Sequence, residues 1–246
     1  MLKPRIIPQL LLSDNKLIKT TSFKEPKYVG DPVNIIRIFN EKKVDEIILL
    51  DINASARNKI NFKILEKISG ECFMPICYGG GVKTFEDAKI IFSLGFEKIA
   101  LNQALLNNLK LITKISEVFG SQSVVASVNI KKNIFGNQFV YDYLNKKKTN
   151  LKPINLIKKS IENGCGEVLI NFVENDGRLC GLHNKDYINL NLGSFDVPII
   201  LSGGINSIEN IENIFSHNIT AISAGAFFIY HGPHRAVLIS YPKFND

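Results

Sequence analysis

Two long stretches of the chain repeat one pattern of hydrophobic and polar positions. Residues 74–103 read as an apolar run, a glycine turn, an amphipathic helix and a second apolar run, and residues 197–226 read the same way. Gly80 in the first stretch matches Gly203 in the second, 123 positions later, which is half of the 246-residue chain. A repeat at half the chain length predicts a fold made of two similar halves.

The remaining apolar runs and helical patterns alternate along the chain. Apolar runs predict buried strands at 5–12, 45–51, 76–78, 97–101, 123–128, 167–172 and within the second repeat. Helical patterns follow at 32–39, 61–68, 84–94, 107–119, 153–163 and 184–192. We expect a functional loop at 13–32 and a charged hairpin-like insertion at 131–148. The whole pattern predicts a single (β/α)8 TIM barrel over residues 1–246, with internal two-fold duplication, in preference to an open doubly wound sheet.

Composition narrows the class of protein. Hydrophobic residues make up 45% of the chain, but no apolar run reaches the ~18 residues that cross a bilayer. Pro4 and Pro8 interrupt the first apolar run, which we interpret as a strand and not as a signal peptide. The four cysteines, Cys72, Cys77, Cys165 and Cys180, have no metal-binding spacing. We expect reduced core thiols in a cytoplasmic protein without a metal or cofactor.

The net charge of +7 has two interpretations. Lysine clusters at 131–132 and 146–148 resemble a solvated surface, and we see no interleaved aromatic platform for single-stranded nucleic acid. A basic chain equally suits anionic small substrates. We therefore expect neither a nucleic-acid nor a membrane partner.

Glycine-rich segments follow the strands in both halves. They comprise Gly79–Gly81 and Asn102-Gln103 in one half, and Asp176-Gly177, Ser202–Gly204 and Gly225-Ala226 in the other. Glycine allows backbone N–H groups to approach an anion, and the following helix adds its positive end. These segments predict two phosphate sites at one barrel mouth; the alternative is that the glycines only form tight turns.

The same rim offers few groups for proton transfer. Leu11 and Asn129 end the two symmetric strands where a carboxylate pair would be useful, and neither exchanges a proton near neutral pH. Asp51, Asp176 and Lys19 remain as possible catalytic residues. Asp51 is equally well explained as a cap or turn residue.

Four charged residues begin strands at the opposite end of the predicted barrel. Arg5, Glu46, Lys98 and Glu167 have alternating signs of charge and would converge around the bottom opening. They form either ordinary surface ion pairs or a closed polar gate.

Together these motifs resemble the cyclase subunit of imidazole glycerol phosphate synthase over roughly residues 1–230. The resemblance rests on Arg5–Pro8, Gly30–Pro32, Asp45-Glu46, Leu50–Ile52, Gly79–Gly81, Phe119–Gln122, Asp176-Gly177 with Gly181, and Ser202–Gly204. It implies a barrel that docks a glutaminase at its bottom face and conducts ammonia to a bisphosphorylated substrate at its mouth. The implied ammonia gate comprises Arg5, Glu46, Lys98 and Glu167; the implied phosphate site comprises Gly81, Asn102, Asp176, Gly177, Gly204, Gly225 and Ala226; the implied glutaminase interface comprises Asp45, Glu97, Phe119 and Gln122.

The chain also departs from that family. Leu11 and Asn129 stand where the resemblance implies two catalytic aspartates, and Gln103 replaces a hydroxyl residue. The tail after Phe227 lacks a closing helix and resembles paralogues encoded with surface-polysaccharide genes. Our first hypothesis is a barrel that passes ammonia from a glutaminase to a separate amidotransferase acting on a nucleotide-linked acetamido sugar. The second is a genuine histidine-pathway cyclase, and the third is a non-catalytic phosphosugar-binding or scaffold protein.

Overall fold

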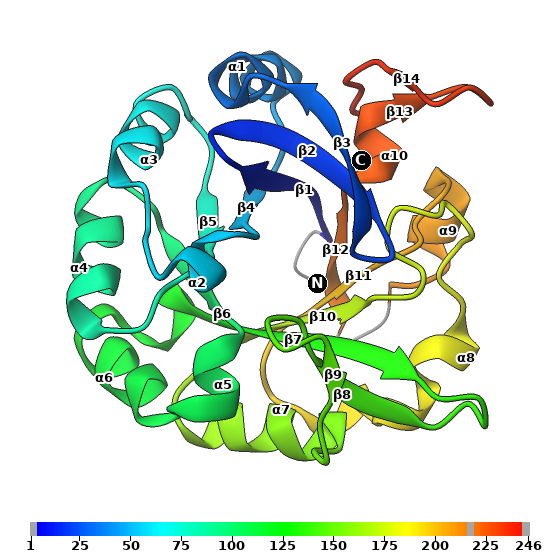
Figure 1. The fold of residues 1–246 in the computed structure, drawn as a ribbon. Helices are drawn as coiled ribbons and strands as arrows, with labels where there is room; N and C mark the ends of the chain where they lie inside the picture. Colours follow the sequence, from blue (N-terminus) through cyan, green and yellow to red (C-terminus); the bar gives the residue numbers. More distant parts are fainter. Residues whose placement is uncertain (1–3, 216–218, 243–246) are drawn as a thin grey trace.

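Eight parallel strands close into a barrel, and helices surround it (Figure 1). The computed structural model describes residues 4–215 and 219–242. The barrel strands are β1 (Arg5–Ser13), β4 (Ile47–Asp51), β5 (Ile76–Gly79), β6 (Lys98–Leu101), β7 (Val124–Lys132), β10 (Glu167–Phe172), β11 (Ile199–Ser202) and β12 (Ile219–Ala224). Each strand pairs with the next, and β12 pairs with β1 to close the ring. The predicted (β/α)8 barrel is confirmed.

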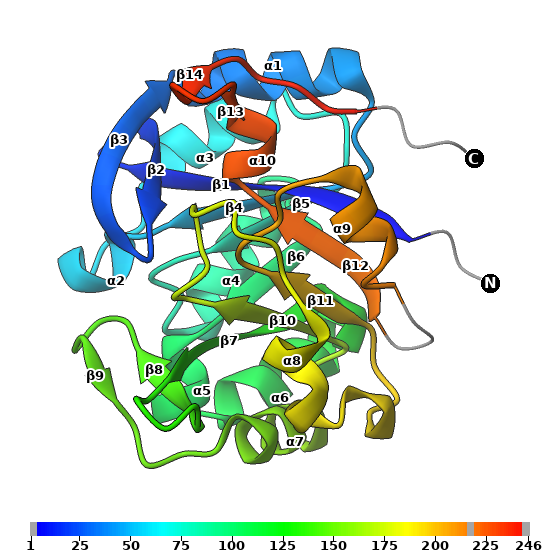
Figure 2. The ribbon, with the colours of Figure 1, turned by 90° about the vertical axis from the view of Figure 1, so that its right-hand side faces the viewer.

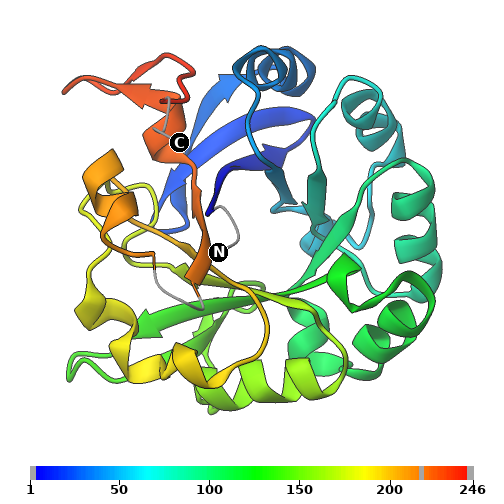
Figure 3. The ribbon, with the colours of Figure 1, turned by 180° about the vertical axis from the view of Figure 1, so that it is seen from behind.

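The helices lie outside the barrel, as Figure 3 shows from behind. They are α1 (Pro32–Lys42), α2 (Ala54–Arg57), α3 (Phe62–Ser69), α4 (Phe85–Ser93), α5 (Gln103–Asn107), α6 (Lys110–Phe119), α7 (Pro153–Glu162), α8 (Asn184–Tyr187), α9 (Ile208–Glu212) and α10 (Ala226–Ile229). Local sequence signals determine where several of these helices begin. Asp31 accepts a hydrogen bond from the Asn34 N–H before Pro32, and Thr84 forms a capping box with Asp87. None of the helices in these described residues is long and apolar enough to cross a membrane.

The barrel interior is built in layers because alternate residues of each strand point inward. The middle layer takes one buried apolar residue from each strand: Ile7, Ile48, Cys77, Ala100, Val125, Leu169, Ile200 and Ala221. The next inward-facing position lies two residues further along each strand, toward its C-terminal end. On five strands a buried, neutral polar side chain occupies this position: Gln9, Ser127, Asn171, Ser202 and Ser223. The interior is therefore apolar at its centre and polar but uncharged below the mouth.

Residues 13–32 contradict the loop predicted there. They contain β2 (Lys16–Thr21) and β3 (Lys24–Gly30), an antiparallel hairpin that continues from β1. Residues 17–20 are all buried, so no alternation of apolar and polar positions marks the strand. The predicted hairpin at 131–148 is confirmed by β8 (Gln138–Asp142) and β9 (Lys147–Lys148). Figure 2 shows both hairpins at the same end of the barrel, away from the N-terminus.

Three further predictions need correction. The helix expected at 107–119 is α6, which begins only at Lys110; residue 107 belongs to the preceding short helix α5. The helix expected at 184–192 is only the short α8, followed by 3₁₀ turns at Ile188–Leu190 and Leu192–Ser194. Cys180 is exposed and Cys72 half-buried, so only Cys77 and Cys165 are core thiols. After α10 the tail forms a small hairpin, β13 (Tyr230–His231) and β14 (Ala236–Val237), in place of a closing helix.

The two halves share a backbone detail at the mouth. A Cβ on Gly80 would lie 2.3 Å from the carbonyl oxygen of Asp51, and a Cβ on Gly203 would lie 2.6 Å from that of Phe172. Both glycines have positive φ, 130° and 107°. Each strand end therefore passes so close to its neighbour that only glycine fits there.

Candidate functional site

The four charged residues at the strand starts form a closed ring. Arg5 donates from Nη1 to Glu46 Oε2 at 2.6 Å and from Nη2 to Glu167 Oε1. Lys98 Nζ lies 3.0 Å from both Glu46 oxygens and 2.9 Å from Glu167 Oε2. Each cation therefore contacts both carboxylates, which isolated surface ion pairs do not do. The geometry matches the gate arrangement, while conduction of ammonia through it stays a prediction.

The two carboxylates of the ring are buried, while Arg5 and Lys98 are 27% and 18% exposed, and this sets the electrostatics of the ring. The Glu46 and Glu167 side chains are only 4% and 5% exposed. Burial alone would lower the pKa of Lys98, but its attraction to Glu167 and Glu46 outweighs burial and raises the pKa overall. The same balance raises the pKa of Arg5. Lys98 and Arg5 therefore keep their positive charges at neutral pH, and each faces both carboxylates of the ring.

The predicted glutaminase-interface residues lie around this ring, at the same end of the barrel. Asp45, Glu97 and Gln122 are exposed, and Phe119 is half-buried against Phe92, with ring centroids 4.3 Å apart. Asp45 Oδ2 also accepts from the Ile6 N–H at 3.0 Å. These positions share one accessible surface, and their role in partner binding stays a prediction.

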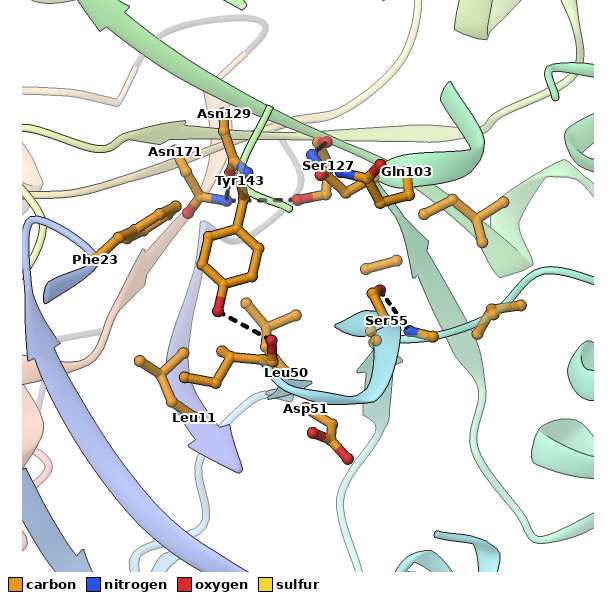
Figure 4. A pocket seen from close by; sticks show the side chains of 18 of the residues that line it. Leu11, Phe23, Leu50, Asp51, Ser55, Gln103, Ser127, Asn129, Tyr143 and Asn171 are labelled. Atoms are coloured by element: carbon orange, nitrogen blue, oxygen red, sulfur yellow. Dashed lines mark hydrogen bonds between the residues drawn. The ribbon is translucent and has the colours of Figure 1, made fainter. Parts of the chain in front are cut away.

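A pocket of about 120 Å³ occupies the mouth at the other end (Figure 4). Leu11, Leu50 and Phe23 form apolar walls, while neutral amides and hydroxyls supply most of the polar groups. No Lys or Arg occurs among the described residues that line it. The Thr20 hydroxyl is buried with no hydrogen-bond partner among the described residues, so the pocket wall retains unused polar capacity.

Leu11 and Asn129 both line this pocket, as predicted from their strand-end positions. The Asn129 Oδ1 accepts from Asn171 Nδ2 at 3.3 Å, and the same Nδ2 approaches Ser127 Oγ at 3.4 Å. Leu11 offers no polar atom. Neither of the two positions provides a group that accepts or releases a proton near neutral pH.

Asp51 lines the pocket, but its carboxylate is already engaged. It accepts from the Asn53 and Ala54 N–H groups at 3.1 Å and from Arg57 Nη2 at 3.1 Å. Figure 4 shows the carboxylate turned away from the centre of the pocket. Burial raises the pKa of Asp51, and Arg57 together with the two N–H groups offsets only part of that effect. The cap interpretation fits this geometry better than a catalytic role.

The glycine-rich segments of the second half, Asp176-Gly177, Ser202–Gly204 and Gly225-Ala226, surround a site that we call the second cradle. Lys19 and Asp176 form a buried ion pair there. Lys19 Nζ lies 2.8 and 3.0 Å from the two Asp176 oxygens, and the side chains are 2% and 7% exposed. A Cβ on Gly225 would lie 3.1 Å from Lys19 Nζ, so the lysine fills the cradle. Only about 10 Å³ remains free between Asp176, Gly177, Gly203, Gly204, Gly225 and Ala226. The Lys19 side chain occupies the space that a phosphate at this site would need.

The corresponding site of the first half lies between Gly79–Gly81 and Asn102-Gln103, and we call it the first cradle. It is more open than the second. The Gly81 N–H donates to Ser55 Oγ at 3.2 Å, and Asn102 Nδ2 donates to the Ser127 carbonyl at 2.7 Å. Both residues line the mouth pocket. The serine hydroxyl thus takes the place that an anion oxygen would occupy, and phosphate binding stays a prediction.

Tyr143 roofs the pocket, and the sequence alone gave us no sign of it. Its hydroxyl donates to the Ile52 carbonyl across the mouth at 3.0 Å, and its ring meets Phe23 edge-on at 5.8 Å (Figure 4). The turn that carries Tyr143 is held by buried Asp142, which accepts from Gln103 Nε2 at 3.1 Å. Residues from both hairpins therefore close over the barrel.

The polar interior layer was also missed, although a signal was present. Counting four residues onward from Arg5 and Glu167 gives Gln9 and Asn171, which point into the same interior. Gln9 Oε1 accepts from Ser202 Oγ and Ser223 Oγ, both at 3.1 Å. Period-two counting from the charged ring would have found this layer.

Comparison with known proteins agrees with this architecture. Residues 5–234 match the family described as histidine biosynthesis protein. A Pseudomonas aeruginosa protein provisionally named as an imidazole glycerol phosphate synthase subunit, hisF2, is 47% identical over 247 residues, covering 100% of this chain and 98% of the relative. A Vibrio vulnificus protein provisionally named hisF3 is 40% identical over 99% of this chain and 94% of its own length, and imidazole glycerol phosphate synthase subunit HisF of Natranaerobius thermophilus is 34% identical over 94% and 91%. The chain belongs to the histidine biosynthesis protein family, within its HisF group of imidazole glycerol phosphate synthase subunits.

Proposed function

We propose that this chain is the ammonia-conducting barrel of a glutamine amidotransferase complex. A glutaminase docks on the face that carries Asp45, Glu97, Phe119 and Gln122, and ammonia passes inward through the charged ring. It leaves at the mouth for a separate enzyme that amidates a nucleotide-linked acetamido sugar of a surface polysaccharide. This function separates the chain from relatives named as synthase subunits without further qualification.

One combination of observations carries the proposal: the ring at the bottom is complete, while neither Leu11 nor Asn129 at the mouth is a proton-transfer group. The ring keeps all four ion-pair contacts. At the mouth, Leu11 and Asn129 present a methyl surface and an amide. Losing two general acid/base groups costs about 10²–10⁴-fold for each group. A barrel that supplies ammonia but does not cyclise needs the ring and not the carboxylates.

The interior suits passage of neutral ammonia. Beyond the ring lies the apolar layer that includes Ile7 and Leu169, where an ammonium ion would pay a large desolvation penalty. The amides and hydroxyls that follow, such as Gln9 and Asn171, can then hydrogen-bond to ammonia without protonating it. Conversion of an acetamido to an acetamidino group replaces the carbonyl oxygen with nitrogen. The acceptor enzyme must therefore first transfer a phosphoryl or nucleotidyl group from a nucleoside triphosphate to that oxygen, which then leaves as phosphate or nucleoside monophosphate when ammonia adds to the carbon.

The test is turnover of the bisphosphorylated histidine-pathway intermediate by the purified chain with ammonium chloride. We expect turnover near the uncatalysed rate, and robust cyclisation would refute the proposal. A second arm adds a glutaminase of the imidazole glycerol phosphate synthase type from the same organism and measures glutamine hydrolysis. We expect a stoichiometric complex in which Lys98→Met alters hydrolysis or ammonia retention, while Lys89→Met on the outer surface of α4 does not.

The second candidate is a genuine cyclase that uses Asp51, Asp176 or Lys19. Asp51 gives it some support, because this residue lines the mouth pocket and burial raises its pKa. Against it, Asp51 is bound by Arg57, and Asp176 is bound by Lys19. If this candidate were right, the wild-type chain would already be a cyclase, and the double substitution Leu11→Asp with Asn129→Asp would add little. We expect instead that the wild-type cyclase activity is negligible and that the double substitution raises it.

A further inference from the structure

The hairpin that extends β7 carries the most exposed apolar side chains at the mouth end of the barrel. We define the arm as residues 131–139, the part of β7 and β8 that extends outward from the rim of the barrel beside α8 (Figure 1). Ile134 and Phe135 at its tip are 93% and 81% exposed. Neither side chain contributes to the barrel core. Two adjacent large apolar side chains held in water indicate a contact surface.

Hydrogen bonds hold the tip of the arm in a defined turn. Asn133 Oδ1 accepts from the N–H groups of Phe135 at 3.0 Å and Asn137 at 2.9 Å, and the Gly136 N–H donates to the Asn133 carbonyl at 2.9 Å. Gly136 has φ of 79°, a left-handed conformation that favours glycine. The turn therefore presents Ile134 and Phe135 in a fixed geometry, which lowers the entropic cost of binding.

The base of the arm is fastened to the barrel. Lys132 Nζ lies 2.7 Å from Asp186 Oδ1, and the Lys132 N–H donates to Glu174 Oε2 at 3.2 Å. Gln138 Nε2 also donates to the Asp186 carbonyl. Both sides of the hairpin are thus held next to α8. The tip has a defined position relative to the mouth.

Lysines outnumber acidic residues over the arm and the β8–β9 strand pair, although Lys132 of the arm is paired with Asp186. Residues 131–148 contain five lysines and one aspartate, and Lys146, Lys147 and Lys148 are exposed. Lys131 Nζ lies 3.8 Å above the Tyr141 ring, and Lys148 Nζ lies 5.2 Å from the Phe139 ring centre. Both rings are covered by lysine side chains, and the absence of a nucleic-acid partner stays a prediction. The surface complements an acidic protein face with an apolar pocket.

We propose that the arm is the docking element for the ammonia-accepting enzyme, an activating sugar amidotransferase whose acidic surface receives Ile134 and Phe135. This inference rests on the proposed function. Ammonia that leaves at the mouth must reach its acceptor without mixing with solvent, so the acceptor has to cover the mouth. The opposite face has its own exposed apolar residues, Phe73 at 85% and Val118 at 64%, beside the predicted glutaminase surface. The barrel is thus held between two partners.

Photo-crosslinking in the bacterium that carries the gene tests both interfaces separately. Phe135→benzoylphenylalanine is expected to crosslink to an amidotransferase with a nucleotide-activating domain, and Val118→benzoylphenylalanine to the glutaminase. Ile90→benzoylphenylalanine on α4, at a position that is 41% exposed, is the matched control and is expected to capture neither. A crosslink from position 135 to nucleic acid, to the glutaminase or to a second copy of this chain overturns the docking proposal. Failure of position 118 to capture a glutaminase counts against the proposed function instead.

Reconstitution with the captured amidotransferase supplies the functional readout. Ile134→Ser with Phe135→Ser is expected to lower glutamine-dependent amidation of the acetamido sugar at least about tenfold, because hot-spot residues dominate such interfaces. Glutamine hydrolysis and amidation driven by ammonium chloride should not change, and the melting temperature should stay at the wild-type value because both side chains are exposed. Ile188→Ser, at a position that is 59% exposed beside α8, is the control. Unchanged glutamine-dependent amidation in the double variant overturns the proposal.

Discussion

Removing Lys98 tests whether the charged ring is one buried unit. Lys98→Met leaves Glu46 and Glu167, which are 4% and 5% exposed, with Arg5 as their shared cation. Breaking a buried ion pair costs about 3–5 kcal/mol. The Lys98 side chain is 18% exposed, so we expect the lower end, about 3 kcal/mol at pH 8. For a chain of this size that corresponds to a fall of about 6–12 °C in melting temperature.

The loss should depend on pH in a direction that the ring fixes. In the wild type, Glu167 and Glu46 outweigh burial and raise the pKa of Lys98 above its ordinary value. The folded state therefore holds the Lys98 proton more tightly than the unfolded state does. This contribution is complete below the ordinary lysine pKa of about 10.4 and is lost as the pH rises through the raised pKa, so Lys98→Met should cost about the same at pH 8 and pH 5 and less only at alkaline pH.

Urea unfolding at pH 8 and pH 5 measures both effects. Lys89→Met removes an exposed lysine from α4 and should change the free energy of unfolding by no more than about 0.5 kcal/mol. Lys98→Arg keeps the positive charge and should recover most of the lost stability at pH 8. If Lys98→Met costs less than about 1 kcal/mol at both pH values, the ring behaves as ordinary surface ion pairs and our reasoning is wrong.

Three further substitutions probe the mouth and the scaffold. Gly80→Ala places a Cβ 2.3 Å from the Asp51 carbonyl oxygen and should cost more than about 3 kcal/mol in calorimetry, whereas Gly95→Ala, with open space around it, should cost about 1 kcal/mol. Thr84→Ala removes the capping box of α4 and should cost about 1 kcal/mol in urea unfolding. Tyr143→Phe loses the hydrogen bond across the mouth and should cost about 1 kcal/mol, measured with faster hydrogen exchange in the β2–β3 hairpin.

The barrel could be predicted because its signals are local and repeated. Apolar runs of four to nine residues and amphipathic helices alternate in two matching halves, and the Gly80–Gly203 correspondence survives as a shared backbone approach. The β2–β3 hairpin could not be predicted, because Leu17, Ile18 and Lys19 are buried in succession. Burial on both faces removes the alternation by which a strand is recognised.

Some residues of the candidate site could be predicted from the sequence and others could not, again because only local patterns are visible in a sequence. Charged residues at strand starts stand out against apolar neighbours, so Arg5 and Glu167 were visible in the sequence. Tyr143 lies 91 positions from the Ile52 carbonyl that it bonds, and Lys19 lies 157 positions from Asp176. Nothing local marks such pairs, because a side chain's partner across a barrel depends on closure and on where the hairpins fold.

By itself, the sequence determined the strand and helix periods, the duplication, the charge at the strand starts and the presence of non-titrating side chains at Leu11 and Asn129. These are properties of spacing and side-chain chemistry, which the chain carries before it folds. Tertiary structure alone decided that four charges share one buried ring, that Lys19 fills a glycine cradle, and that Tyr143 closes the mouth. Each of these depends on the distance between atoms from separate strands, and only barrel closure sets that distance.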